Sequence, residues 1–233
     1  NWGRLDGIST VAIKALVYLT WASPRFNPDG DMERWQKAAE CAKEVMDFKM
    51  TVDNLSGGFS VGRQVDWCDP NNPEIVYASR YKSSNDDMER AFYPGGFQGN
   101  GTMGATQELV DAYEMEDGST PITGYTNNGL KPIVNTASGY IEEGYTNKAE
   151  DGRWPSGVRN MYVGREPRFY ASINFPGQIW KQNHELAFWY EGVDGKKYAG
   201  SDYCKTGYLM RKINNIDITS NPLKTEIGRA SCR

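Results

Sequence analysis

The sequence predicts a mainly α-helical fold with an irregular α+β part. Two amphipathic helical patterns follow each other near the N-terminus. After about residue 55 the chain becomes rich in Gly and polar residues, with short strand-like runs between turn signals. Hydrophobic residues make up 39% of the 233 residues, which is enough for a globular core. We therefore expect a helical hairpin at residues 1–55 and an irregular, loop-rich region at residues 56–225.

The two predicted helices are the best-defined elements. The first spans residues 8–22, where apolar side chains recur at helical spacing until Ser23-Pro24 ends the pattern. The second spans residues 31–48, with Asp31 as its N-cap and Ala residues along its apolar stripe. Small residues facing large ones resemble the hairpin of a tetratricopeptide repeat. An isolated hairpin of this kind would expose an apolar face.

Shorter patterns predict the later elements. Thr106 is a suitable N-cap for a helix through residue 115. Residues 119–164 have little periodicity, and a loop of that length is usually functional or partly disordered. Apolar and aromatic runs between turn signals predict strands at residues 74–81, 169–175, 186–191 and 207–212.

The charge balance argues against a nucleic-acid partner. The net charge is −4, and outside the last eight residues no basic run is longer than two residues, as at Lys196-Lys197, whereas phosphate binding needs clustered Lys and Arg. Seven Trp and 14 Tyr accompany a mean hydropathy of −0.67, so many rings are expected at a polar surface. Exposed rings of this kind suit sugars or peptides. No stretch approaches the 18 apolar residues of a membrane span.

The sequence predicts neither a metal nor another cofactor. Cys41, Cys68 and Cys204 are far apart and lack the Cys-x-x-Cys spacing of zinc sites, and the sequence leaves open whether they form disulfides. Residues 27–31 offer oxygen ligands, but they lack the distal Glu of a calcium loop and coincide with a helix start.

No catalytic residues are predicted. Glycoside hydrolysis needs two carboxylates about 5 to 10 Å apart across the scissile bond, and adjacency in sequence does not provide that geometry. His184 has neither a nucleophile signature such as Gly-x-Ser-x-Gly nor a second His for a metal, and we expect it at the surface or in a turn. The acidic pairs considered are Asp86-Asp87, Glu142-Glu143 and Asp66 with Asp69.

Several phrases in a fixed order carry a family resemblance. They are Gly3-Arg4 followed by Ala22-Ser23-Pro24, then Asn72-Pro73-Glu74-Ile75-Val76, residues 106–115 (TQELVDAYEM), residues 165–171 (REPRFYA) and residues 206–212 (TGYLMRK). In order and wording these phrases closely resemble the SusD/RagB family of surface lipoproteins, which capture nutrients for outer-membrane transporters. The resemblance runs from about residue 2 to residue 213. It departs at Glu166, where the family usually has Asp.

The resemblance implies a SusD-like fold, in which tetratricopeptide-like hairpins form the scaffold and an irregular segment carries the ligand site. It also implies an outer-membrane lipoprotein at the cell surface that binds an oligosaccharide or polysaccharide and passes it to a SusC-like TonB-dependent transporter. The family phrases are scaffold signatures, and no ligand residue can be transferred from them.

The ends of the sequence suggest an internal fragment. Residue 1 is Asn, and a helical pattern begins a few residues later. Residues 226–233 resemble a translated sequencing adapter. We therefore expect the lipid anchor implied by the resemblance to lie outside this sequence.

Loop aromatic residues are the predicted ligand contacts. Aromatic rings offer flat faces to the C–H groups of pyranoses, and polar side chains hydrogen-bond the hydroxyls. Residues 90–100 combine three rings with Gly and amides, although such rings could equally fill the scaffold. Tyr140 and Tyr145 are further candidates, ranked after Trp154. The predicted ligand residues are Phe92, Tyr93, Phe97, Asn100, Trp154 and Trp67. The aromatic residues expected to pack in the core or beside strands are Trp21, Trp35, Trp180, Trp189 and Tyr190.

Three alternatives to glycan capture stay open at the level of the sequence. Some members of the resembled family capture peptides instead of glycans. A glycoside hydrolase would turn over a labelled oligosaccharide, and mutation of paired carboxylates would abolish that activity. A pure repeat scaffold would bind a protein partner, and mutation of the loop aromatic residues would then have no effect.

Overall fold

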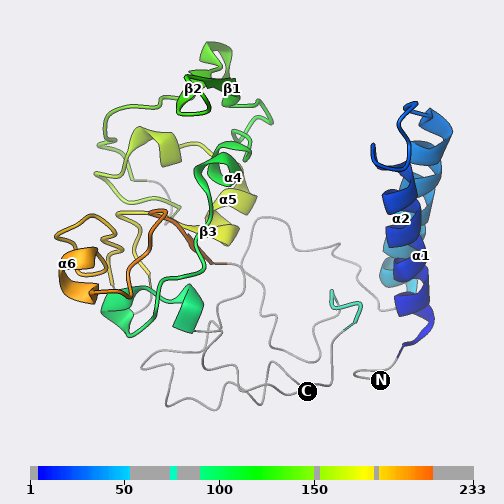
Figure 1. The fold of residues 1–233 in the computed structure, drawn as a ribbon, viewed down its shortest axis with the longest axis horizontal. Coiled ribbons are helices and arrows are strands. Elements are labelled where there is room, and N and C mark those ends of the chain that lie inside the picture. Colours follow the sequence, from blue (N-terminus) through cyan, green and yellow to red (C-terminus); the bar gives the residue numbers. More distant parts are fainter. Residues whose placement is uncertain (1–4, 53–73, 78–89, 150–152, 181–183, 212–233) are drawn as a thin grey trace. The chain divides into compact units, whose positions relative to one another are not determined.

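The computed structural model describes residues 5–52, 74–77, 90–149, 153–180 and 184–211 (Figure 1). These residues form two compact units. The first contains residues 5–52 and 74–77, and the second contains the described residues from 90 onward. The structure is mainly helical with a few short antiparallel strands, which confirms the predicted fold class. The predicted boundary at residue 55 and the segment 226–233 lie outside the described residues.

The first unit is a hairpin of α1 (Gly7–Ala22) and α2 (Met32–Val52). Asp6 caps α1, since its carboxylate accepts a hydrogen bond of 3.0 Å from the backbone N–H of Ser9. The carboxylate of Asp31 accepts an equivalent bond of 2.9 Å from the second residue of α2. Both helices are therefore confirmed with nearly the predicted bounds. No helix in the described part of the chain is long and apolar enough to cross a membrane.

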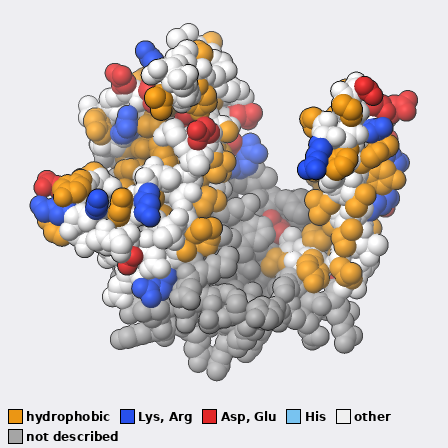
Figure 2. Space-filling model, viewed as in Figure 1, with side chains coloured by type: hydrophobic (Ala, Val, Ile, Leu, Met, Phe, Trp, Pro, Cys, Tyr) orange, Lys and Arg blue, Asp and Glu red, His pale blue; other side chains and the backbone are white. Residues whose placement is uncertain are grey.

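The hairpin leaves many apolar side chains exposed (Figure 2). Trp21 and Trp35 keep 43% and 38% of their surface exposed, so the expectation that both lie in the core is wrong for this chain. The physical reason is that two helices bury only the stripes that face each other. The buried apolar residues of the hairpin are Ile8, Ala22, Ala38 and Cys41.

The second unit consists of short elements joined by turns. β1 pairs antiparallel with β2, and Asn127 and Asn128 in the turn between them adopt φ angles of 52° and 54°. Asn is among the few residues that tolerate this left-handed region. β3 pairs antiparallel with β4. In chain order the elements are η1 (Gly95–Phe97), α4 (Gln107–Asp111), β1 (Ile122–Thr126), β2 (Lys131–Val134), η2 (Thr136–Ser138), η3 (Asn160–Tyr162), α5 (Pro167–Ser172), β3 (Ile173–Asn174), α6 (Lys196–Ala199) and β4 (Leu209–Met210).

Several predicted elements of this unit need correction. Residues 167–172 form a helix instead of the strand predicted from residue 169, because Pro167 occupies a first-turn position where proline favours helix. The predicted strand at 186–191 is absent, and within the described residues 207–211 the strand predicted at 207–212 is reduced to β4. The segment 119–164, predicted as a loop, contains the β1–β2 hairpin. The predicted strand at 74–81 is a turn and bend in its described residues, 74–77.

Two clusters of buried side chains form the core of the second unit. The larger one is rich in aromatic rings, including Phe169 and Phe175, which stack with ring centroids 5.4 Å apart. The smaller one contains Tyr93, Trp180 and Phe188. Members of both clusters line the pocket described next, so the pocket rests on the most tightly packed part of the unit.

Candidate ligand-binding site

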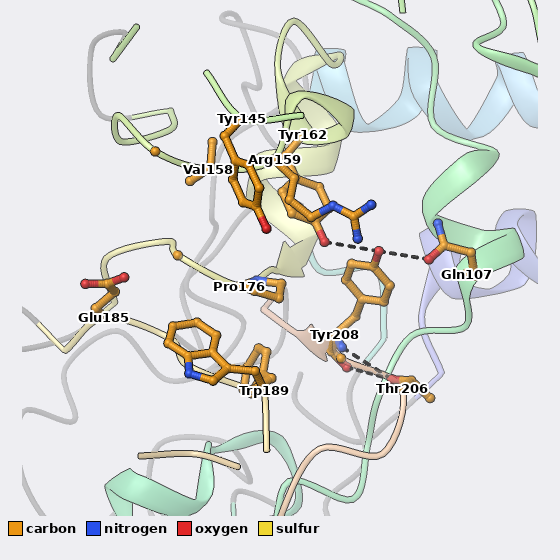
Figure 3. A pocket seen from close by; sticks show the side chains of 14 residues that line it. Gln107, Tyr145, Val158, Arg159, Tyr162, Pro176, Glu185, Trp189, Thr206 and Tyr208 are labelled. Carbon is orange, nitrogen blue, oxygen red and sulfur yellow. Dashed lines mark hydrogen bonds between the residues drawn. The ribbon is translucent and has the colours of Figure 1, made fainter. Parts of the chain in front are cut away.

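An open pocket of about 640 Å³ lies in the second unit (Figure 3). Its lining comes from four separate parts of the chain, at Gln107 and within residues 145–162, 176–189 and 206–208. Small-molecule sites in proteins typically measure about 300–1,000 Å³. The pocket therefore has the size of a ligand site, and its open form gives a ligand access from solvent.

One wall is built by backbone pairing between residues 144–146 and 158–160. The backbone N–H of Thr146 donates to the carbonyl of Val158 at 2.9 Å, and the backbone N–H of Asn160 donates to the carbonyl of Gly144 at 3.0 Å. Tyr145 and Arg159 are the bridge partners between these two bonds. Side chains of such a directly opposed pair lie on the same face, with Cβ atoms about 4.5–5.5 Å apart. The pairing thus places a ring and a cation together in the pocket.

The other wall is a tight turn that contains Pro176 and Gly177. The backbone N–H of Gly177 donates to the carbonyl of Leu186 at 2.8 Å, which ties this turn to residues 184–189. Gly177 has a φ of 84°, and a Cβ there would lie 3.1 Å from a methyl group of Val158. Glycine is therefore required for the close approach of the two walls.

Two exposed aromatic rings stand at the pocket. Tyr145 is 72% exposed and Trp189 is 53% exposed, and Figure 3 shows them on opposite sides of the opening with Pro176 between them. Trp189 was expected to pack, and this expectation is wrong. Its neighbour Phe188 is buried. Trp189 itself begins a turn, in which the backbone N–H of Gly192 donates to the carbonyl of Trp189, and its ring is exposed.

A hydrogen-bond chain supports the polar side of the pocket. The hydroxyl of Tyr162 donates to that of Tyr208 at 3.2 Å, which donates to Oε1 of Gln107 at 2.9 Å (Figure 3). The amide of Gln107 donates in turn to the buried carboxylate of Asp111 at 2.8 Å, and Tyr125 donates to the other carboxylate oxygen. Burial raises the pKa of Tyr162 and Tyr208, so both phenols stay protonated and keep their donors.

Arg165 connects the backbone segments that carry this hydrogen-bond chain. Its side chain is fully buried and donates to the carbonyls of Val110 and Tyr113, both at 2.6 Å, and of Met161 at 3.1 Å. Its guanidinium carbon also lies 5.2 Å from the ring centroid of Phe169. Arg165 therefore joins α4 to η3 and holds the pocket residues Gln107 and Tyr162 in place.

The predicted ligand residues lie elsewhere. Phe92, Tyr93 and Trp154 are buried, with 3%, 0% and 5% of their surface exposed, which leaves no ring face for a ligand in this conformation. The surrounding loops enclose them, and Tyr93 packs on Trp180 while Trp154 stacks on Tyr170. Phe97 and Asn100 are half-buried and do not line the pocket, and Trp67 lies outside the described residues. Their role in ligand binding stays a prediction.

Sequence reasoning named Tyr145 only as a secondary candidate and did not identify Trp189 or Arg159. The local sequence gives little signal for any of the three. Phe188 and Trp189 are adjacent aromatic residues, and only tertiary packing decides which one is buried. Arg159 gains its position from a pairing with Tyr145 that bridges a separation of 14 residues.

The described residues contain no cluster of three or more His, Cys, Asp or Glu suited to a metal. Cys41 and Cys204 are buried as free thiols, and Cys68 lies outside the described residues. Of the acidic pairs considered from the sequence, only Glu142-Glu143 is described. Glu142 accepts a hydrogen bond of 2.6 Å from the hydroxyl of Tyr140.

His184 forms an ion pair next to the pocket wall. Its Nε2 lies 3.0 Å from both carboxylate oxygens of Asp194. The Asp194 side chain is fully buried and also accepts the backbone N–H groups of Gly96 and Ala187. The hydrogen bond to Asp194 raises the pKa of His184. The pair therefore ties η1 to the segment that carries Trp189.

Comparison with known proteins identifies the family. No curated protein matches the chain. A model of the SusD family matches residues 58–232, which include the second unit and the phrases at 106–115 and 165–171. Proteins of this family are nutrient-binding proteins of the outer membrane and not enzymes. Because the match covers most of the sequence, the chain belongs to the SusD family.

Proposed function

We propose that this protein is a surface-exposed lipoprotein that captures an oligosaccharide in the pocket between Tyr145 and Trp189 and passes it to a SusC-like TonB-dependent transporter. The observation that carries the proposal is the pair of exposed rings on opposite sides of one pocket. Flat rings suit the apolar C–H faces of pyranoses, and the polar groups beside them suit sugar hydroxyls. Membership of the SusD family supports a nutrient ligand and a partner transporter in general.

The open pocket is suited to capture followed by release. Contacts between aromatic rings and a sugar bury apolar surface without a covalent bond, so two rings provide binding that is reversible. Gln107 and Arg159 add hydrogen-bonding groups on one wall. An oligosaccharide held in this way can leave for a transporter without any covalent step.

The pocket also supports binding without hydrolysis. Glycoside hydrolases position two carboxylates across the scissile bond. Among the described residues that line the pocket, Glu185 alone carries a carboxylate. We therefore expect bound glycans to remain intact.

Affinity electrophoresis of the full-length protein, without its lipid anchor, tests the proposal. The gels would contain plant and host polysaccharides, and the variants would be Tyr145→Ala with Trp189→Ala and, as a control, Tyr198→Ala. Tyr198 is an exposed aromatic residue in α6 and does not line the pocket. We expect at least one polysaccharide to retard the wild type and the control but not the double variant.

Three results would contradict the proposal. Retardation by no glycan, together with binding of a peptide, would indicate peptide capture. Equal retardation of the double variant would place the glycan site elsewhere. The release of reducing sugars over time would show that the protein is an enzyme.

A further inference from the structure

Arg159 places a cation in the lining of the pocket. Its side chain is exposed, and it forms no ion pair or hydrogen bond with any residue that the structure describes. Two other Arg side chains of the second unit form ion pairs, Arg153 with Glu116 and Arg168 with Glu166. A guanidinium carries five N–H donors in a planar fork that matches a carboxylate. Arg159 is therefore available to an anionic group of a ligand.

Among the described residues that line the pocket, none on the wall of Arg159 carries a carboxylate. Burial raises the pKa of Tyr162 and Tyr208, and the positive charge of Arg159 only partly opposes this. Figure 3 shows the guanidinium beside the hydrogen bonds that join Tyr162, Tyr208 and Gln107. These phenols remain neutral, and the amide is neutral. Glu185 lies on the opposite wall, apart from Arg159 (Figure 3).

Tyr145 and Arg159 can contact the same sugar residue. Their side chains lie on one face because they are partners at an antiparallel bridge. In a uronic acid the carboxylate replaces the terminal hydroxymethyl group and projects from the edge of the ring. A ring that lies against Tyr145 can therefore direct this carboxylate to the neighbouring guanidinium.

We propose that the pocket selects acidic oligosaccharides, with a uronate carboxylate bound by Arg159 while the sugar ring lies against Tyr145. This inference rests on the proposed glycan-capture function and defines the class of glycan. The guanidinium and the carboxylate would form a charge-assisted, bidentate pair of hydrogen bonds, and such pairs are among the strongest that proteins make to carboxylates.

The test compares one uronate-containing oligosaccharide with its carboxyl-reduced form, which has the same linkages but no charge. Isothermal titration calorimetry would measure both ligands with the full-length wild-type protein at low salt. We expect the acidic form to bind at least about tenfold more tightly, as a charged hydrogen bond predicts. The difference should shrink as salt is raised, because the pocket is open to solvent.

Two substitutions test whether Arg159 causes the preference for the acidic form. Arg159→Gln should bind both forms equally, with the affinity that the wild type has for the reduced form. Retained binding of the reduced form would also show that the pocket of the variant is intact. Arg25→Gln is the matched control, since Arg25 is an exposed Arg of the first unit, and it should keep the preference.

The outcomes separate this inference from the proposed function. Equal wild-type affinity for the two forms would overturn the acidic preference while glycan capture stands. A preference that persists in Arg159→Gln would show that another residue binds the carboxylate. Binding of neither form, nor of any other glycan, would overturn both proposals.

Discussion

Tyr145 and Arg159 are direct partners at an antiparallel bridge, and this relationship puts a solvent-exposed ring and a guanidinium on one wall of the pocket. The backbone bonds on either side of the bridge fix their register. A slip of one segment by one residue would turn its side chain to the opposite face and separate the ring from the guanidinium. The chemistry of this wall therefore depends on backbone pairing as much as on the identity of the two side chains.

The family phrases act as the scaffold of this pocket. Thr106 caps α4, Gln107 and Asp111 of the same phrase continue the hydrogen-bond chain from Tyr208, and Arg165 binds carbonyls at the end of α4. The phrases at residues 106–115, 165–171 and 206–212 thus meet in one network. This explains how they can identify the family without identifying the ligand.

Replacing Arg165 should destabilise the second unit severely. In Arg165→Met three buried carbonyl acceptors lose their donor, and we expect a loss of about 3 kcal/mol or more in the free energy of unfolding. Arg168→Met is the control, because Arg168 is largely exposed and its loss should lower the free energy of unfolding much less than the loss of Arg165. Urea denaturation followed by fluorescence measures both, and equal midpoints for the two variants would contradict the role of Arg165.

Tyr208→Phe should break the hydrogen-bond chain behind the pocket. The change removes one hydroxyl and leaves Tyr162 without its acceptor and Gln107 without its donor. We expect a loss of about 1–3 kcal/mol in unfolding free energy, whereas Tyr190→Phe, at an exposed Tyr outside the pocket lining, should change it by less than about 0.5 kcal/mol. Chemical denaturation provides the measurement, and an unchanged stability of Tyr208→Phe would show that the chain does not contribute.

The pair of His184 and Asp194 should make stability depend on pH. Because the hydrogen bond to Asp194 raises the pKa of His184 in the folded state, its contribution is complete below the unfolded value near 6.5 and is lost as the pH rises through the folded value. The stability difference between the wild type and His184→Gln should therefore be largest at acidic pH and decline above about pH 6.5.

Two measurements check this pH dependence. Denaturation of both proteins at pH values from about 5.5 to 9 gives the stability difference directly. The proton NMR signal that disappears in His184→Gln reports the pKa of this side chain, which is the only His in the sequence. A His184 pKa at or below its ordinary value, or a stability difference that does not change with pH, would contradict the prediction.

Local sequence patterns were sufficient for the two long helices and for the start of α4 but not for the pocket. Helical periodicity and caps predicted α1 and α2 almost to their ends, and Thr106 predicted the start of α4. The aromatic run at 169–171 suggested a strand because strand propensity depends on context, and Pro167 overrode it by starting α5. Ring exposure depends on contacts between distant segments, which a local pattern does not record.

The positions of the tryptophans illustrate this difference. Trp154 lies in a glycine-rich region and was predicted to bind ligand, yet its ring is buried against Tyr170. Trp189 lies in a predicted strand, yet it is exposed at the pocket. Both side chains have the same chemistry, and only the packing of the second unit assigns one to the core and the other to the surface.

A crystal structure of the full-length protein with the oligosaccharide that binds best would locate the ligand directly. We expect a sugar ring between Tyr145 and Trp189, with its polar groups near Arg159 and Gln107. Electron density for the sugar over Phe97 and Asn100, with the pocket empty, would contradict the proposed site and support the location that the sequence suggested.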